Sequence, residues 1–300
     1  MSKIETALQK LTTDQKSLVS GDKGEVSRRG AAETSAASGA TGFRQEARDL
    51  RVQARKSIKI NREMLFESGV LISEQDQQEL RDEMRRIKWP VLANAFGEQS
   101  DSIRRGNVVM VASATSGEGK TFTTTNLAMS IAAEQDHGVI LVDADIVNPK
   151  LSEAFGIVEH PGVIDFLLGE VADVADIIIG TDLPGLSLIP AGRAHEHASE
   201  LLASNRMAFL VSQLNDHYPS SIVLFDTSPI LQTNESQVLS RIVGQVLLVV
   251  AANKTPQHAA IEAVRMLGTD RVVNLIFNGV NALFRQRYRY GGYYGYQSRR

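Results

Sequence analysis

The chain has 300 residues, with 32 lysines and arginines against 35 aspartates and glutamates and a net charge of −3. This balance gives no overall attraction to nucleic acid or to a membrane surface, and the absence of cysteine excludes disulfides and thiolate metal sites. The sequence shows neither a signal-peptide core nor an apolar run near the roughly eighteen residues of a membrane-spanning helix. We therefore expect a cytoplasmic protein made of one large α/β domain with extensions, or of two small domains.

Residues 1–72 are predicted to form an N-terminal extension. Apolar residues at helical spacing within residues 1–18 indicate a short amphipathic helix, and residues 20–42, rich in Gly, Ala, Ser and Thr, indicate a flexible linker. A basic segment follows, which is either a solvated helix face or a surface for anionic lipid or an acidic partner. Its basic residues are Arg44, Arg48, Arg51, Arg55, Lys56, Lys59 and Arg62.

A second helix is predicted to begin near Ser73, which can form a capping pair with Asp76. Pro90 is expected to end this helix, and Trp89 beside it is expected to anchor packing. The apolar residues that fall on one face of the helix are Leu80, Met84 and Ile87.

From residue 107 onward, short and almost continuously apolar runs alternate with helical stretches. Such runs are typical of strands that are buried on both faces, and the alternation predicts right-handed crossovers. The fold class is therefore α/β, with a mostly parallel sheet of the P-loop NTPase type and helices on both faces. The runs cover residues 108–114, 139–145, 186–192, 221–229, 245–253 and 272–280.

The first of these runs leads directly into ATSGEGKT, residues 114–121, and then into a helical stretch. This is a phosphate-binding loop of the form [AG]-x4-G-K-[ST], with Ala114 in place of the usual first glycine. Its backbone N–H groups and the following helix N-terminus would hold the β-phosphate of ATP, Lys120 would bridge the β- and γ-phosphates, and Thr121 would ligate Mg²⁺. The predicted nucleotide site comprises Ser116, Gly117, Glu118, Gly119, Lys120, Thr121 and Phe122.

Three aspartates end two further predicted strands. Asp143 and Asp145 follow VILV, and Asp226 follows SIVLF, as in a Walker B motif. A single strand-end aspartate could merely cap a helix, but three beside a phosphate loop favour a metal and catalytic site. We expect Thr121, Asp143 and Asp226 to hold Mg²⁺, and Asp143 to take the proton of a hydroxyl nucleophile.

Five of the six tyrosines lie in the last thirteen residues, among glycines and arginines. A terminal segment of this composition cannot build a core, so residues 285–300 are predicted to be a flexible tail beyond a domain of residues 73–284. Its tyrosines are either acceptors for phosphoryl transfer or part of a sticky, disordered end. They are Tyr288, Tyr290, Tyr293, Tyr294 and Tyr296.

The motifs SGEGKT, VDADIVNPK and LFDTSP resemble the three Walker motifs of the bacterial tyrosine kinases, which are autokinases of capsular and exopolysaccharide export. GVIDFLL, LIPAG, SELL and the tyrosine tail are also similar, so the resemblance covers about residues 73–300. Residues 83–97 and residues 2–11 resemble the exosortase-associated subgroup. One departure is Asn148, where many members have arginine before the proline.

The resemblance implies that Asp143 activates the acceptor tyrosine, with Asp145 and Asp226 supporting the metal. It also implies a homo-oligomer, in some members a ring, that forms through an E-x2-R-x2-R helix. The matching register here is Asp82, Arg85 and Lys88. The implied partners are other tyrosine-containing proteins and a separate membrane-embedded activator of the polysaccharide co-polymerase type, which would recruit the chain to the inner face of the membrane.

Three functions follow from these observations. The first is an ATP-dependent tyrosine autokinase that phosphorylates its own tail, in trans, and regulates exopolysaccharide polymerisation or export. The second is an ATPase switch of the MinD/ParA class, although Thr115 stands where that class carries its signature lysine. The third is a non-catalytic module whose binding to an export complex is tuned by nucleotide. A metal site at His195 and His197 is disfavoured because no third ligand lies nearby in the sequence.

Overall fold

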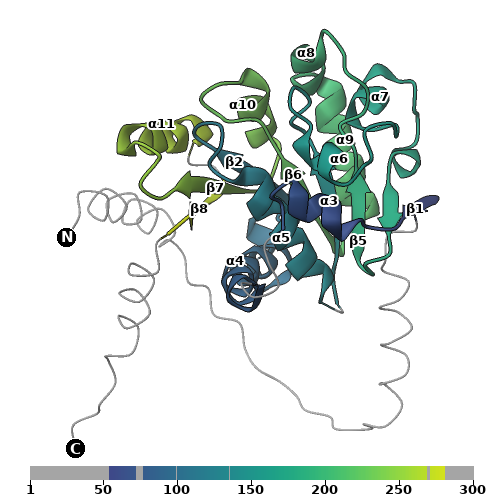
Figure 1. The fold of residues 1–300 in the computed structure, drawn as a ribbon. Helices are drawn as coiled ribbons and strands as arrows, with labels where there is room; N and C mark the ends of the chain where they lie inside the picture. Colours follow the sequence, from purple (N-terminus) through teal and green to yellow (C-terminus); the bar gives the residue numbers. More distant parts are fainter. Residues whose placement is uncertain (1–53, 72–76, 99, 135, 269–270, 281–300) are drawn as a thin grey trace, which may run out of the picture. The chain divides into compact units, whose positions relative to one another are not determined.

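An eight-stranded sheet with helices on both faces forms the centre of the fold (Figure 1). The computed structural model describes residues 54–71, 77–98, 100–134, 136–268 and 271–280. The strand order is β1-β4-β5-β3-β6-β2-β7-β8, and every pair is parallel except β4 with β5. The predicted fold class is therefore confirmed. The strands are β1 (Lys56–Ile58), β2 (Val108–Ser113), β3 (Gly138–Asp143), β4 (Ile179–Thr181), β5 (Leu186–Ile189), β6 (Ser221–Asp226), β7 (Gln245–Ala251) and β8 (Val272–Asn278).

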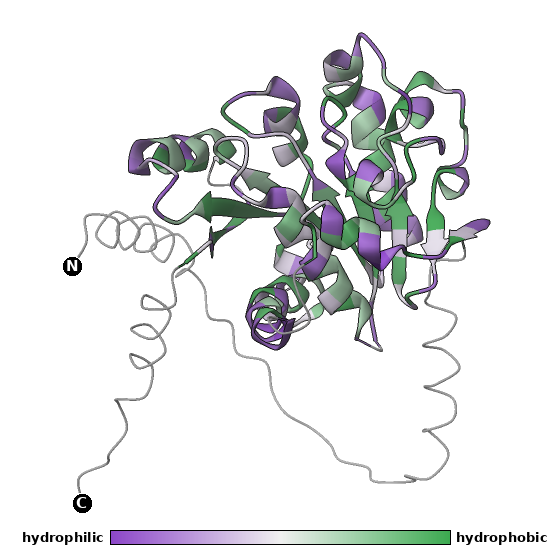
Figure 2. Ribbon diagram, in the orientation of Figure 1, coloured by the Kyte–Doolittle hydropathy of each residue, from purple (hydrophilic) through white to green (hydrophobic). Residues whose placement is uncertain are grey.

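Each of the six predicted apolar runs overlaps one of these strands, and the central strands are buried on both faces. Alternate residues of β2 show the arrangement: Val108, Met110 and Ala112 pack into one core, and Val109 and Val111 into the other. The green strands between more purple helices in Figure 2 reflect this burial. Residues of α7 (Val163–Leu168), α8 (Ala198–Leu202), α9 (Asn205–His217), α10 (Asn234–Ser240) and α11 (Gln257–Leu267) complete the first core. Residues of α3 (Arg62–Glu67), α4 (Gln77–Phe96), α5 (Lys120–Ala132) and α6 (Lys150–Ala154) complete the second.

The fold begins before residue 73, within the segment that the sequence assigns to the extension. Lys56–Ile58 is strand β1, which pairs with β4, and Leu65 of α3 is completely buried. Arg55 forms ion pairs with Asp173 and Asp176 of the neighbouring loop. This end of the basic segment is therefore part of the sheet edge and not the solvated helix face that its charge pattern favours.

Helix α4 corrects two expectations. It continues through Pro90 to Phe96, because Val91 packs into the core beyond the proline and outweighs the one lost backbone hydrogen bond. Trp89 is 75% exposed and anchors no packing within the described chain. The predicted capping residues Ser73 and Asp76 lie outside the described residues, as do residues 1–53 and the tyrosine tail.

Within the part of the chain that the structure describes, no helix combines the length and the apolar character needed to cross a lipid bilayer.

Candidate nucleotide and phosphoryl-transfer site

The sheet order brings the predicted motifs together at one edge. β6 lies between β2 and β3, so the ends of these three strands are neighbours. Asp143 and Asp226, the last residues of β3 and β6, lie directly opposite each other in the strand register. The phosphate loop leaves β2 at the same edge, which is where parallel α/β sheets bind ligands.

The phosphate loop has the backbone that such a loop requires. Gly117 and Gly119 have positive φ angles of 76° and 93°, which a residue with a Cβ rarely adopts, and α5 begins immediately afterwards at Lys120. Ser116 and Gly117 are exposed, and Phe122 is half-buried in the first turn of α5. These predicted residues therefore surround a helix N-terminus that is open to an anionic group.

Lys120 is almost buried at the base of the loop. Its Nζ donates to Ser113 Oγ at 3.1 Å, and Ser113 is the last residue of β2. Burial lowers the pKa of the Lys120 ammonium, and the negative charge of Asp226 acts in the opposite direction. An additional anion at this position would favour the charged lysine.

Thr121 contacts the Walker B carboxylate directly. Its Oγ1 donates to Asp226 Oδ2 at 2.7 Å, and Thr124 Oγ1, one turn later on α5, donates to Asp226 Oδ1 at 3.1 Å. Burial raises the pKa of Asp226 to about 6, although the Thr121 hydrogen bond lowers it. The structure thus brings together the hydroxyl and the carboxylate that were predicted to share a magnesium ion.

Asp143 is closed off from solvent. Its exposed fraction is 0%, and its Oδ2 accepts from both the backbone N–H of Ser152 at 2.8 Å and the Ser152 hydroxyl at 2.7 Å. Burial, reinforced by the nearby charge of Asp226, raises the pKa of Asp143 to about 8. Both carboxylate oxygens of Asp143 thus accept hydrogen bonds from within the described chain, and its expected role as the proton acceptor stays a prediction.

Asp145 is the accessible member of the aspartate set. It is partly exposed, and its Oδ1 accepts from the Ser228 hydroxyl at 2.7 Å and from the Asn148 N–H at 3.3 Å. Asp145 also donates its own N–H to Asp143 Oδ1 at 3.2 Å. The two aspartates of this motif therefore have different surroundings, one buried and one turned toward the open edge of the sheet.

Four hydroxyl residues around the site carry no signal in the sequence alone. Serine and threonine are common, and only the sheet order shows which of them face the carboxylates and the lysine. They are Ser113, Thr124, Ser152 and Ser228.

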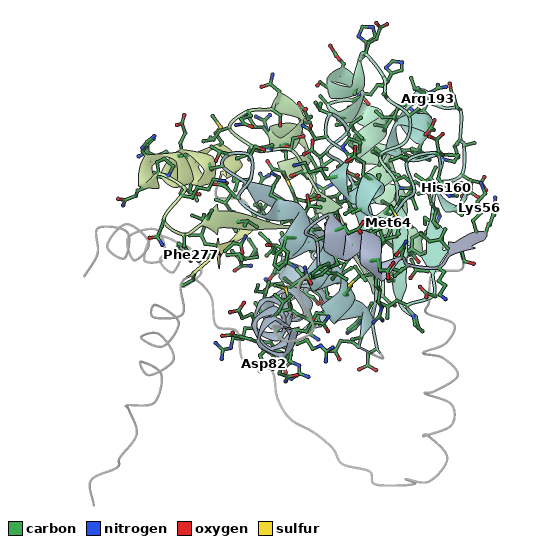
Figure 3. All side chains as sticks on the ribbon, in the orientation of Figure 1. Lys56, Met64, Asp82, His160, Arg193 and Phe277 are labelled. Atoms are coloured by element: carbon green, nitrogen blue, oxygen red, sulfur yellow. The ribbon has the colours of Figure 1, made fainter. Side chains whose placement is uncertain are left out.

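The residues predicted for oligomerisation do not share one surface. Asp82 and Arg85 pair with each other at 3.3 Å on the outer side of α4, where Figure 3 labels Asp82. Lys88 is instead 8% exposed, and its Nζ donates to Ser130 O of α5 at 3.0 Å and pairs with Glu134, just after that helix. Lys88 lies six positions after Asp82, about 120° around the helix and on the buried side.

A register one residue later is more accessible. Glu83 is partly exposed, whereas Arg86 and Trp89 are exposed, and the three keep the spacing E-x2-R-x2 with tryptophan in the third place. The oligomerisation register thus stays a prediction, and the exposure of α4 favours the second of the two registers.

Among the described residues, no group of three or more histidine, aspartate or glutamate side chains is arranged to hold a metal unaided. His195 Nδ1 accepts from the backbone N–H of His197, and His197 lies 3.5 Å from Glu196. A Mg²⁺ ion at the sheet edge is compatible with this finding, because Mg²⁺ is commonly held by one or two carboxylates together with substrate phosphates and water.

Comparisons with known proteins agree with this geometry. The family "CobQ/CobB/MinD/ParA nucleotide binding domain" matches residues 109–278. The tyrosine-protein kinase YwqD of Bacillus subtilis is 31% identical over 194 residues, which cover 64% of this chain and 79% of YwqD. The tyrosine-protein kinase ptk of Acinetobacter johnsonii is 32% identical over 154 residues, which cover 51% of this chain and 20% of ptk. The chain therefore spans only a small part of that longer relative.

A solved structure leads to the same family. The VpsO kinase domain is 29% identical and superposes with a TM-score of 0.57, covering 70% of this chain and all of that domain. The nucleotide-binding fold, the three Walker motifs and the extent of the match to YwqD thus agree. The chain belongs to the CobQ/CobB/MinD/ParA family of nucleotide-binding domains and, within it, to the bacterial tyrosine-protein kinases.

Proposed function

We propose that this chain is an ATP- and Mg²⁺-dependent protein-tyrosine autokinase that phosphorylates its C-terminal tyrosines, in a neighbouring subunit, and thereby regulates exopolysaccharide polymerisation or export. The observation that carries the proposal is the junction of the phosphate loop with the strand-end carboxylates. Thr121 bonds to Asp226 at 2.7 Å, and Asp226 lies opposite Asp143. A phosphoryl-transfer enzyme needs this combination of anion-binding loop and oxygen ligands at one sheet edge.

Thr121, Asp226 and Asp143 would hold Mg²⁺. All three offer oxygen donors, which suit this hard cation, and two buried carboxyls with raised pKa values lie side by side where a cation would relieve their repulsion. When bound, Mg²⁺ supplies charge neutralisation for the β- and γ-phosphate oxygens. The loop N–H groups and Lys120 would orient the triphosphate, so that catalysis depends mainly on positioning and electrostatics.

We assign Asp145 as the base that takes the proton of the acceptor tyrosine. In the transfer, the tyrosine Oη forms a bond to the γ-phosphorus, the bond from that phosphorus to the β,γ-bridging oxygen breaks, and the phenolic proton passes to a base. Asp145 is partly exposed beside the phosphate loop, whereas Asp143 is buried and fully hydrogen-bonded. Ser228 would hold Asp145 in place through its 2.7 Å hydrogen bond.

The tail supplies the acceptors in this proposal. Each phosphate adds nearly two negative charges at neutral pH, so several of them would reverse the charge of a tail with five arginines. Phosphorylated tails would then leave acidic active sites, and the assembly would loosen.

We further propose that assembly uses the exposed side of α4, and that a separate membrane-embedded polysaccharide co-polymerase recruits and activates the chain. Other tyrosine-containing proteins are additional substrates in this proposal.

Incubation with labelled ATP and Mg²⁺ tests the central claim. Wild type should acquire phosphotyrosine, and Lys120→Met and a deletion of residues 285–300 should not. Lys56→Met, which changes an exposed lysine at the far edge of the sheet, is the matched control and should behave like wild type. Absence of phosphotyrosine in wild type refutes the kinase, and label that persists without the tail moves the acceptor elsewhere.

A switch of the MinD/ParA type is the second candidate, because the matching family includes those ATPases. It predicts ATP hydrolysis without phosphotyrosine in the same experiment. Nucleotide binding with neither hydrolysis nor transfer would favour the third candidate, a non-catalytic module of an export complex.

A further inference from the structure

A buried carboxylate lies inside the phosphate loop and has no part in the proposed chemistry. Glu118 is 1% exposed. Its Oε2 accepts from the backbone N–H of Thr115 at 2.9 Å, and its Oε1 accepts from the hydroxyl of Thr255. Both oxygens are turned into the protein, so the Glu118 side chain does not face a bound nucleotide.

Thr255 connects the loop to a different strand. It follows β7 in the turn before α11, and its Oγ1 also accepts from the N–H of Ala251, the last residue of β7, at 3.0 Å. The hydroxyl therefore uses its one proton toward Glu118 and one lone pair toward the strand. A continuous chain of hydrogen bonds joins Ala251, Thr255, Glu118 and Thr115.

Two further contacts hold the outer side of the loop. Lys254 Nζ donates to Gly117 O at 3.1 Å, and Asn278 Nδ2, at the end of β8, donates to Glu118 O at 2.9 Å. In a trans peptide the N–H points away from the preceding carbonyl. Carbonyls held on the outer side therefore leave the N–H groups of Glu118 and Gly119 on the opposite side, where a phosphate would lie.

We propose that Glu118 and Thr255 are positioning residues for nucleotide binding: their side-chain link ties the start of the phosphate loop to the end of β7 and holds the loop in its phosphate-binding shape. This inference rests on the proposed nucleotide-dependent function. Its consequence is that the turn after β7, which contacts no catalytic aspartate in the described structure, sets the affinity for nucleotide.

The test is the dissociation constant for Mg·ADP, measured by calorimetry on the full chain. Thr255→Val removes the hydroxyl and leaves a buried carboxylate oxygen without its donor, so affinity should fall about tenfold. Thr255→Ser keeps the hydroxyl, and its dissociation constant for Mg·ADP should stay within about twofold of the wild-type value. Thr181→Val removes another partly buried, hydrogen-bonded hydroxyl, in β4 at the far end of the sheet, and should leave affinity unchanged.

Glu118 provides an independent measurement. Glu118→Ala should weaken nucleotide binding about as much as Thr255→Val. Glu118→Gln should retain most of the wild-type affinity, because its amide can form hydrogen bonds with both Thr115 and Thr255. The Glu118→Ala/Thr255→Val double variant should bind no more weakly than either single variant, because both break one link. In kinase assays with the variants, the KM for ATP should rise while kcat at saturation stays near wild type.

The outcomes separate the two proposals. Wild type that binds no nucleotide overturns the proposed function. If wild type binds Mg·ADP and Thr255→Val binds it equally well, the positioning role alone is overturned. The same follows if the losses of affinity in the double variant are additive. If Thr255→Val does not fold, the comparison of Glu118→Ala with Glu118→Gln decides the question.

Discussion

Replacing Asp143 with asparagine should change how the stability of the nucleotide-free protein depends on pH. Asp143 is a buried carboxyl whose pKa is raised from 3.8 to about 8, chiefly by burial and also by Asp226. Between these two pH values the unfolded chain has lost the proton and the folded chain retains it. The folding free energy supplied by this group is therefore complete below about pH 4 and is lost as the pH rises toward 8.

The size of the effect follows from the width of that window. Each pH unit corresponds to about 1.4 kcal/mol, so four units set a ceiling of about 6 kcal/mol. Relaxation and water entry reduce such penalties in real proteins, so we expect the free energy of unfolding to fall by about 2–3 kcal/mol across this pH range. Asparagine can still accept from Ser152 but loses the 3.2 Å contact with the Asp145 N–H, at a cost of about 1 kcal/mol at every pH.

Denaturant unfolding in EDTA from pH 5 to pH 9 measures this difference. Asp143→Asn should be similar to wild type or slightly less stable at pH 5, and more stable than wild type at pH 9. Asp101→Asn, at an exposed position, is the control and should follow wild type throughout. A difference between Asp143→Asn and wild type that stays constant over the whole range would refute the reasoning, because a buried titrating carboxyl requires a slope.

Three further outcomes are expected. Lys88→Met should lower the free energy of unfolding by about 1–3 kcal/mol, through loss of its bonds to α5, and leave the assembly mass in sedimentation unchanged. Trp89→Ser should leave the unfolding midpoint unchanged but reduce the assembly mass, because its ring is 75% exposed on α4. Gly119→Ala should abolish nucleotide binding in calorimetry while the protein still folds, because its φ of 93° is strained for alanine and the new Cβ would lie 2.0 Å from Asn278 Nδ2.

The sheet and the Walker residues were predictable because their signals are local. Buried parallel strands are continuously apolar, and a glycine-rich loop between a strand and a helix has a recognisable spacing. The strand-end positions of Asp143 and Asp226 follow from the same pattern, since parallel strands end at one edge. The short strands β1 and β4, of three residues each, escaped prediction because three residues show no periodicity.

The errors on α4 have a different cause. The effect of Pro90 on a helix depends on what the following turn can bury, and Val91 supplies that burial only in the folded chain. Lys88 shows the same limit, since its charge predicts a surface position. Its long side chain instead reaches the carbonyl of Ser130 in α5 and the carboxylate of Glu134 just after that helix.

The difference between Asp143 and Asp145 also depends on tertiary structure. The sequence places them two residues apart after the same strand, and nothing in it separates a buried aspartate from an accessible one. The separation comes from Ser152, which satisfies Asp143 from α6, and from Ser228, which holds Asp145 from the loop after β6. The surroundings of the two aspartates are thus set by residues that the motif does not contain.

The phosphate loop illustrates the same principle on its other side. As a sequence motif it is a self-sufficient segment of eight residues, yet in the fold its carbonyls at Gly117 and Glu118 are held by Lys254 and Asn278. Lys254 lies in the turn after β7 and Asn278 ends β8, and these two strands follow β2 in the sheet on the side away from Asp143 and Asp226. The loop therefore lies between two sets of strand ends, one that would hold the metal and one that fixes the loop itself. A substitution in either set would change nucleotide affinity, but only one in the set that would hold the metal would also act on the transferred phosphate. We therefore expect that nucleotide affinity can be altered without changing the transfer rate.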